Sequence, residues 1–185
     1  MRKRNLFHQI HLSYRVQGFT LIEALVVVAM LGVLTALAAP SFSAFVDRYR
    51  VNAAREELIG TLNFARTEAI RTGQPVVLVR RTGCSAPLAN DSDWDCGWRA
   101  FVDANDNNTA DAGEPFIRDT QEPQGVSVSH EQGGTTNLQI NRFGMLNSQR
   151  FVLSPRSIGP TSPGTLSICV TAGGRARTVK GNPAC

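Results

Sequence analysis

The feature that most constrains this chain is an apolar run near its N-terminus. Residues Phe19–Ala39 contain a single ionisable side chain, that of Glu23. As a helix that rises about 1.5 Å per residue, a run of this length crosses the hydrocarbon core of a membrane. A charged side chain inside lipid is costly and usually marks a function. The run therefore predicts a transmembrane helix in which Glu23 has a task of its own.

The flanks of the run predict its orientation. Residues 1–18 carry four basic side chains and no acidic one. Because basic flanks stay on the cytoplasmic side, everything after Pro40 should lie on the far side of the membrane from the cytoplasm. An ordinary secretory signal also has a basic start and an apolar run, and residues 36–39 could serve as its cleavage site. That alternative gives Glu23 no role, so we disfavour it.

The segment Gly18–Glu23 has the sequence GFTLIE and is followed by the apolar run and by Pro40. In this arrangement it resembles the class III signal of type IV pilins and type II secretion pseudopilins. The resemblance implies that a prepilin peptidase cleaves after Gly18 and that Phe19 becomes the methylated N-terminus. It also implies that Glu23 pairs with the Phe19 ammonium of a neighbouring subunit in a filament. Such a pair would set the axial register and offset the cost of burying either charge alone.

The pattern after Pro40 remains helical as far as Thr72. Apolar side chains recur at three- and four-residue spacing, and Gly73 followed by Pro75 is a stop signal. We expect this apolar stripe to pack in the core, and we expect Pro40 to kink the helix where membrane gives way to domain. The stripe consists of Phe42, Phe45, Val46, Tyr49, Ala53, Leu58, Leu62, Ala65 and Ala69.

Beyond the helix, short β-branched and aromatic runs alternate with clusters of Gly, Pro, Asn and Ser, which indicates antiparallel strands. The predicted fold class is α+β, a type IV pilin-like fold in which a long N-terminal helix packs on antiparallel β-sheet. The expected strands are Val76–Arg81, Gly97–Val102, Phe116–Arg118, Val126–His130, Leu138–Phe143, Phe151–Leu153, Leu166–Val170 and Arg175–Lys180. The expected domains are a cleaved leader at 1–18, a transmembrane and filament-core helix at 19–40, an amphipathic helix at 41–73 and a periplasmic β domain at 74–185.

A second motif lies within Trp94–Arg118. Here Gly97, Trp98, Phe101 and Asp103 are spaced as Gly-Trp-x-x-Phe-x-Asp. This segment resembles the GspH/FimT branch of the pilin superfamily. The resemblance implies a minor subunit rather than the bulk pilin of a filament.

Four cysteines in an exported domain predict two disulfides, and the sequence alone allows three pairings. We favour Cys84 with Cys96, across a polar loop, and Cys169 with Cys185, which would tie the C-terminus to a strand. The alternative is a metal site of four thiolates. The sequence lacks the paired C-x-x-C spacing of such sites, and an exported domain is in an oxidising compartment.

The acidic segment 103–114 partly matches the calcium-binding loop of the EF-hand, so it is a weak candidate for calcium binding. The match is incomplete, because position 6 of that loop should be glycine and is Asn108 here. The flanks also predict strands, whereas the EF-hand has helices there. The alternative is a solvated hairpin, because Asn and Asp tolerate the backbone angles of turns. We therefore expect no cofactor. The side chains at loop positions 1, 3, 5, 7, 9 and 12 are Asp103, Asn105, Asn107, Thr109, Asp111 and Glu114.

Catalysis finds no support in the sequence. The mature chain has one histidine, His130, and it lacks a Gly-rich phosphate loop and a nucleophile motif. We expect His130 to be structural or exposed. The chain is predicted not to be an enzyme.

The C-terminal third is strongly basic. After Glu131 there are six basic residues and no acidic one, in a chain whose formal net charge is +4. Side chains alternate along a strand, so Arg175 and Arg177 should project from one face and grip adjacent phosphates. The alternative is a solvated turn whose arginines protect an edge strand from aggregation.

The segment Gly174–Arg177 also resembles the C-terminal Gly-Arg-x-Arg motif of FimT-type minor pilins. The resemblance implies capture of double-stranded DNA in natural transformation, with Lys180 as a further cation of the same segment. The alternative function is an H-type pseudopilin of a type II secretion filament with no DNA role. In both cases the expected partners are other pilins, the prepilin peptidase and the inner membrane.

Overall fold

The computed structural model describes residues 18–86, 88, 90–132 and 136–185, and the predicted leader at residues 1–17 lies outside the described part. The side chains of residues 38–40 lie outside it as well. The chain divides into two compact units, Met1–Pro40 and Ser41–Cys185. The kink at Pro40 stays a prediction.

The helix α1 (Leu21–Thr72) has well-defined ends. At its start, Thr20 Oγ1 accepts a hydrogen bond from the Glu23 N–H at 3.2 Å, so Thr20 caps the helix. At its end, Gly73 takes a left-handed φ of 68° and donates its N–H to Ala69 O at 3.0 Å. The predicted helix end near Thr72 is confirmed.

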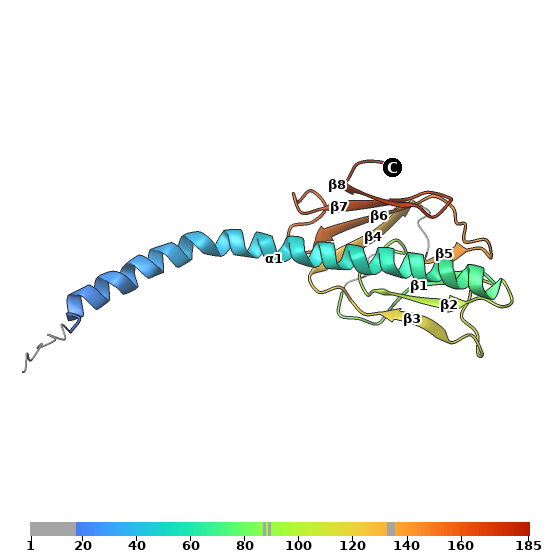
Figure 1. Ribbon diagram of the computed structural model, residues 1–185, viewed down its shortest axis with the longest axis horizontal. Coiled ribbons are helices and arrows are strands. Elements are labelled where there is room, and N and C mark those ends of the chain that lie inside the picture. The colour runs from blue at the N-terminus through green and yellow to red at the C-terminus, as the bar shows by residue number, and fades with distance from the viewer. Residues whose placement is uncertain (1–17, 87, 89, 133–135) are drawn as a thin grey trace, which may run out of the picture. The chain divides into compact units, whose positions relative to one another are not determined.

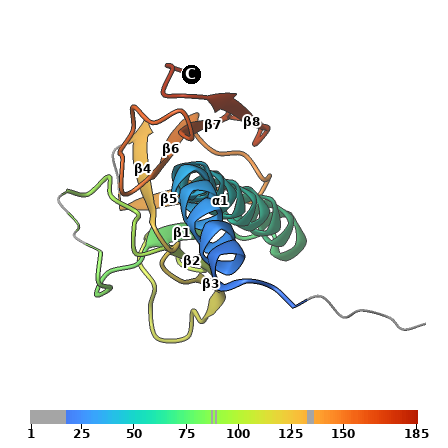
Figure 2. The same ribbon diagram turned by 90° about the vertical axis from the view of Figure 1, so that its left-hand side faces the viewer.

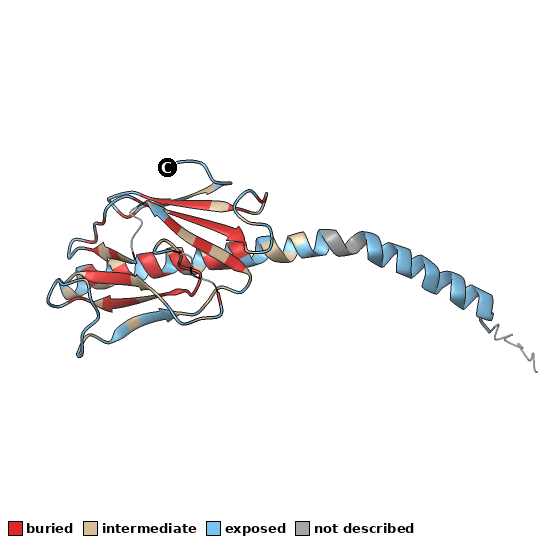
Figure 3. Cartoon of the chain, turned by 180° about the vertical axis from the view of Figure 1, so that it is seen from behind, coloured by how far each residue is buried: buried red, intermediate tan, exposed pale blue. Residues whose placement is uncertain are grey.

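In the first unit, every described side chain from Gly18 to Leu37 is exposed (Figure 3). Its large apolar side chains, among them Leu25 and Leu31, have no cover within the unit. By length and composition, no single described helix passes as a membrane span, whereas Leu21–Leu37 and Ser41–Thr72 pass when taken as a pair.

The second unit pairs the Ser41–Thr72 part of α1 with two antiparallel sheets (Figure 1). Within the described residues, one sheet has the strand order β3-β2-β1-β5 and the other has the order β4-β6-β7-β8. Figure 2 shows the two sheets following one another around one side of this helical segment. The strands are β1 (Val76–Arg80), β2 (Trp98–Val102), β3 (Phe116–Thr120), β4 (Val126–Gln132), β5 (Asn137–Ile140), β6 (Gln149–Pro155), β7 (Leu166–Val170) and β8 (Ala176–Lys180).

Each predicted strand has its counterpart, and the predicted α+β fold class is confirmed. The clearest difference is at β5, which was expected to reach Phe143 and ends at Ile140. The Asn141 side chain explains it, because its Oδ1 accepts hydrogen bonds from the N–H groups of Phe143 and Met145, both at 3.0 Å. Asparagine thus turns the chain at the point where the ladder stops.

The core lies between α1 and the inner faces of both sheets (Figure 3). Trp98 is fully buried there, and its Nε1 donates to Thr61 Oγ1 of the helix at 3.1 Å. This bond satisfies two polar groups that would otherwise be buried without partners. The helix contributes Val51, Ala54, Leu58, Leu62, Ala65 and Ala69 to the core.

The predicted apolar stripe of the helix is therefore only partly correct. Its C-terminal members from Leu58 onward are buried, but Phe42, Phe45 and Tyr49 are 66–69% exposed and Ala53 is exposed. The physical reason is that core contacts begin at Val51, where Val51 and Ala54 carry the buried face. Three aromatic side chains of the second unit consequently remain on its surface.

Candidate functional site

The C-terminal hairpin joins β7 to β8 through the turn Thr171–Arg175. Gly174 has a φ of +76° and donates its N–H to Thr171 O at 2.7 Å, while the Thr171 N–H donates to Arg175 O at 3.1 Å. Gly174 is buried, and a Cβ on it would lie 2.5 Å from Cδ of Arg66. The turn therefore needs glycine both for its backbone angle and for the close approach of the Arg66 side chain.

The hairpin brings Arg175 and Arg177 together. Both side chains are exposed and both line one groove of about 490 Å³. Within the described part of the chain, neither guanidinium takes part in an ion pair. The remaining wall of the groove is formed by Ser148, Gln149, Cys169, Val170, Thr171 and Cys185.

Lys180 lies elsewhere, although the sequence grouped it with the two arginines. It lines a separate groove of about 460 Å³ together with Arg48 and Arg55 of α1. Register explains the separation, because Lys180 pairs with Leu166 while Arg177 pairs with Cys169, one on each face of the sheet. Sequence reasoning missed Arg48 and Arg55, since nothing local links the helix to the C-terminal strand.

The two disulfides in the described chain are the favoured pairings. Cys84 bonds to Cys96 and Cys169 bonds to Cys185, with Cα–Cα distances of 5.4 and 5.6 Å. Cys169 faces the arginine groove from β7, and its bond fixes the C-terminal residue as part of the groove wall. The second disulfide is therefore a direct support of the candidate site.

Other C-terminal arginines are engaged in the structure. Arg150 pairs with Glu131 at 2.7 Å and also donates to Asn182 Oδ1, which holds the tail after β8. Arg156 pairs with Glu122 at 2.9 Å. Arg142, in contrast, is exposed, and its guanidinium lies 5.9 Å from the Phe143 ring centroid. The basic third of the chain thus contains structural as well as free cations.

Asp95 is a buried carboxyl that ties two segments together. Its Oδ1 accepts hydrogen bonds from the Val128 N–H at 2.6 Å and from the Ser127 hydroxyl at 3.1 Å. Burial raises the pKa of Asp95, whereas the Val128 N–H acts in the opposite direction. The Arg156 Nε lies 3.7 Å from the second carboxyl oxygen. These contacts give Asp95 a structural role.

The motif Gly-Trp-x-x-Phe-x-Asp consists of structural residues. Gly97 has a φ of +90°, and a Cβ there would collide with Thr120 O. Phe101 is buried and meets the Phe116 ring edge-on at 6.0 Å between centroids. Asp103 is buried and accepts the Asn107 N–H at 3.0 Å and the Asn108 N–H at 2.8 Å.

The calcium candidate segment uses its carboxylates internally. Glu114 accepts the N–H groups of Ala104 at 2.7 Å and Asp111 at 3.2 Å. The side-chain amides of Asn105 and Asn107 donate to Asp111 and hold the pKa of that carboxyl below its ordinary value. Among the described residues, no group of three or more His, Cys, Asp and Glu side chains is placed to hold a metal ion.

His130 belongs to the aromatic core. Its ring stacks on Phe151 with centroids 4.5 Å apart and meets Trp94 edge-on at 5.3 Å. Its Nε2 is hydrogen-bonded to the Gln149 side chain. Of the two predictions for His130, a structural role or an exposed position, the structure shows the structural role.

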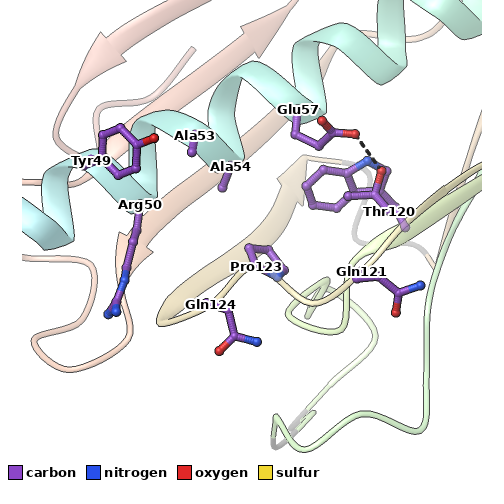
Figure 4. Close-up of a pocket in the computed structure, with 10 residues that line it drawn as sticks. Tyr49, Arg50, Ala53, Ala54, Glu57, Thr120, Gln121, Pro123 and Gln124 are labelled. Atoms are coloured by element: carbon purple, nitrogen blue, oxygen red, sulfur yellow. Dashed lines mark hydrogen bonds between the residues drawn. The ribbon is translucent and has the colours of Figure 1, made fainter.

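A groove of about 340 Å³ lies between α1 and the β3–β4 connection (Figure 4). Glu57 accepts hydrogen bonds there from the Thr120 hydroxyl and from Arg118, both at 3.0 Å. Glu57 is thus held in an ion pair at the wall of this groove.

The predicted processing site lies at the start of the described chain. Gly18, Phe19 and Glu23 are all exposed, and Glu23 is in the first turn of α1. A carboxylate at this position interacts favourably with the helix dipole. Thr20 and Glu23 of the GFTLIE motif thus also define the helix start.

Comparison with known proteins identifies the family. The family described as Type II transport protein GspH matches residues 54–184, and the Prokaryotic N-terminal methylation motif matches residues 14–39. Pilin-like protein PilA1 of Thermus thermophilus is 31% identical over 164 residues, which cover 88% of this chain and 91% of that protein. A Fimbrial protein of Pseudomonas aeruginosa is 29% identical over 122 residues, which cover 66% and 65% of the two chains.

A solved structure shows the same fold. The type IV minor pilin FimU of Pseudomonas aeruginosa aligns with a TM-score of 0.54 and 18% sequence identity over 74% of this chain and 90% of that one. The family match covers the whole β domain and most of the amphipathic helix, and the methylation motif covers the apolar run. The chain therefore belongs to the GspH family of pilin-like proteins, which are structural subunits of pilus-type filaments.

Proposed function

We propose that this minor pilin-like subunit captures DNA through Arg175 and Arg177. The observation that carries the proposal is that both guanidiniums line one groove and are free of ion pairs within the described residues. Guanidinium groups match phosphate geometry and remain charged at every physiological pH. Among the described residues, no acidic side chain lines the groove, so no side chain in its wall opposes the two positive charges.

The same geometry supports binding through phosphates rather than bases. The arginines lie on a short hairpin turn and an edge strand, and the surrounding segment offers no helix that could enter the major groove. Binding should therefore show little preference for sequence. This property suits uptake of double-stranded DNA in natural transformation, where the captured sequence is not known in advance.

A salt titration tests the proposal. The full-length chain in neutral detergent is mixed with labelled duplexes of different sequence, and affinity is measured across a range of salt concentrations. We expect affinity to fall steeply with salt, because each phosphate contact releases counterions. Arg175→Gln with Arg177→Gln should lower the log–log slope by about 0.7–0.9 per lost contact and remove most of the binding.

Arg142→Gln is the matched control. Arg142 is exposed and lies in the same basic third of the chain, but it does not line the arginine groove. Arg150 is unsuitable, because its ion pair with Glu131 and its bond to Asn182 hold the tail. Equal losses in the Arg142 variant and in the double variant would indicate a generic basic surface and contradict a localised site.

We also propose that the N-terminal segment is processed and anchored as the family motif implies. In this proposal the peptidase removes residues 1–18, Phe19 is methylated, and residues 19–40 span the inner membrane until the subunit enters a filament. The exposed apolar side chains of the first unit support this, because they need lipid or neighbouring helices for cover. On the second unit, Phe42, Phe45 and Tyr49 are exposed as well.

A second candidate function is an H-type pseudopilin of a type II secretion filament with no DNA role. The match to the family described as Type II transport protein GspH favours it. The Arg175→Gln/Arg177→Gln variant and a deletion of the subunit distinguish the two functions in cells. Loss of transformation with normal secretion in the variant supports DNA capture, and loss of secretion with normal DNA uptake in the deletion supports the pseudopilin.

A further inference from the structure

A second basic groove lies behind the edge strand β8. Its volume is about 460 Å³, and it is formed by α1, by the segment before β7 and by β8. Three cationic side chains line it, with the Asn52 amide and the Thr178 hydroxyl beside them. The cations are Arg48, Arg55 and Lys180.

Packing holds the stem of Arg48 of α1 in place. A Cβ on Gly164 would lie 3.5 Å from Cγ of Arg48, so the Arg48 stem packs against bare backbone. The residue is exposed and lines the groove, so its charge is accessible to a ligand. In the described part of the chain, neither Arg48 nor Lys180 takes part in an ion pair.

Arg55 has a donor without a protein acceptor. Its terminal nitrogen pairs with Glu56, but its Nε is buried and has no hydrogen-bond partner among the described residues. Its side chain nevertheless adds a third positive charge to the lining of the groove. Phosphate oxygens can accept from several cationic donors at once.

The carboxylates near the groove are too few to cancel its positive charge. No acidic residue lines it. Glu56 is 66% exposed and is the partner of Arg55, and Asp47 accepts a weak hydrogen bond from the Ser157 hydroxyl at 3.5 Å. The three cations of the groove thus outnumber these two acidic neighbours.

The two basic grooves lie on opposite faces of β8. Thr178 and Lys180 line the groove beside α1, whereas Arg177 lines the groove on the other side. Arg177 and Lys180 are three residues apart on β8, so their side chains project from its two faces. Because β8 is an edge strand, a polyanion can pass over it from one groove to the other.

We propose that the groove of Arg48, Arg55 and Lys180 is a second phosphate-binding site, which holds the DNA backbone where it passes over the edge of β8. This inference rests on the proposed capture of DNA by Arg175 and Arg177. It extends the contact from one hairpin to the helix and adds Arg48 and Arg55, which lie far from the C-terminal motif in the sequence.

The test compares double variants of the full-length chain in neutral detergent. Arg48→Gln with Lys180→Gln should lower the salt slope of DNA binding by about 1.4–1.8, the value for two lost phosphate contacts. Binding through the arginine hairpin should remain. Arg175→Gln with Arg177→Gln should retain weak binding that disappears when all four substitutions are combined. Inorganic pyrophosphate should compete with DNA for that residual binding.

The outcomes separate the two proposals. An unchanged slope for Arg48→Gln/Lys180→Gln, together with lost binding for Arg175→Gln/Arg177→Gln, overturns the second site and leaves DNA capture standing. No DNA binding by the native chain overturns both. If the Arg48/Lys180 variant loses pyrophosphate affinity but keeps the native DNA slope, the groove serves another phosphate source and the inference is wrong. Thermal unfolding establishes that the variants remain folded, and Arg142→Gln controls for the loss of positive charge elsewhere in the basic third.

Discussion

The side chain of Arg66 lies directly against Gly174, where an added Cβ would be 2.5 Å from the Arg66 Cδ. The same side chain donates its Nε to Gly144 O at 2.7 Å. One helix residue thus fixes two turns, and the Leu146 N–H adds a bond to Ala172 O at 3.1 Å. The glycine of the Gly-Arg-x-Arg segment therefore positions the hairpin, while the arginines supply the charge.

Gly174→Ala should destabilise the protein and weaken DNA binding without removing any charge. The left-handed φ of 76° and the displaced Arg66 side chain both contribute, at a cost of about 1–3 kcal/mol in the free energy of unfolding. Thermal unfolding and the DNA titration measure the two effects. Gly173→Ala is the matched control, because nothing lies within 4 Å of its Cβ position. Equal effects at both glycines would refute the positioning role.

Gly18→Glu should leave uncut precursor in the membrane. A small residue at the predicted cleavage site lets a protease approach the backbone, whereas a charged side chain obstructs it. N-terminal sequencing and mass spectrometry of the native chain should find N-methyl-Phe19. Detection of a mature N-terminus after Ala39 instead would contradict the pilin-type processing.

Glu23→Ala should permit membrane insertion and leader cleavage but impair incorporation into filaments. The reason is the loss of the charge pair with the neighbouring Phe19 ammonium, which we expect to set the axial register. Shearing of filaments followed by immunoblotting measures incorporation. Glu23→Gln is a sharper variant, since it removes the charge and keeps the side-chain length. Normal assembly of both variants would show that Glu23 has another role.

Loss of the Cys169–Cys185 bond should lower both stability and DNA affinity. In the chain-entropy model a closed loop of this size contributes about 3 kcal/mol to the free energy of unfolding. Its loss also frees the tail that forms part of the groove wall, so the tail must be ordered again on binding. Cys84→Ser with Cys96→Ser is the control, because that bond closes a similar loop away from the groove. If both pairs of substitutions reduce DNA affinity equally, the tail has no specific role.

Asp95→Asn should change how stability depends on pH. Burial raises the pKa of Asp95 in the folded state above its ordinary value of about 3.9. The contribution of this group to stability is therefore complete below the ordinary value and is lost as the pH rises through the folded-state pKa. Asparagine keeps the Oδ1 acceptor but does not titrate. The free energy of unfolding of Asp95→Asn minus that of the native chain should therefore be larger at neutral pH than at low pH, as measured by denaturant unfolding at each pH. If this difference in free energy of unfolding stays constant between low and neutral pH, the pKa of Asp95 is not raised.

Local signals in the sequence predicted much of this protein. The apolar run with Glu23, the stop at Gly73 and the alternation of short apolar runs with turn residues specify the helix and the strands, because each depends on neighbours within a few residues. The sequence allowed three pairings of the cysteines, and the two it favoured, Cys84–Cys96 and Cys169–Cys185, are those in the structure. The sequence also predicted that Arg175 and Arg177 project from the same face of the last strand, because side chains alternate along a strand with a period of two residues.

The tertiary structure alone decided which of these residues meet. Sequence periodicity placed Phe42, Phe45 and Tyr49 in the core, but burial depends on where the sheets begin to cover the helix, and that point is Val51. Register separated Lys180 from the arginines and put it beside Arg48 and Arg55, more than a hundred residues away along the chain. Likewise, the contact between Arg66 and Gly174 exists only because the helix packs against the second sheet. Such long-range pairs leave no periodic or local signal, since the distance between them is set by the packing of whole elements.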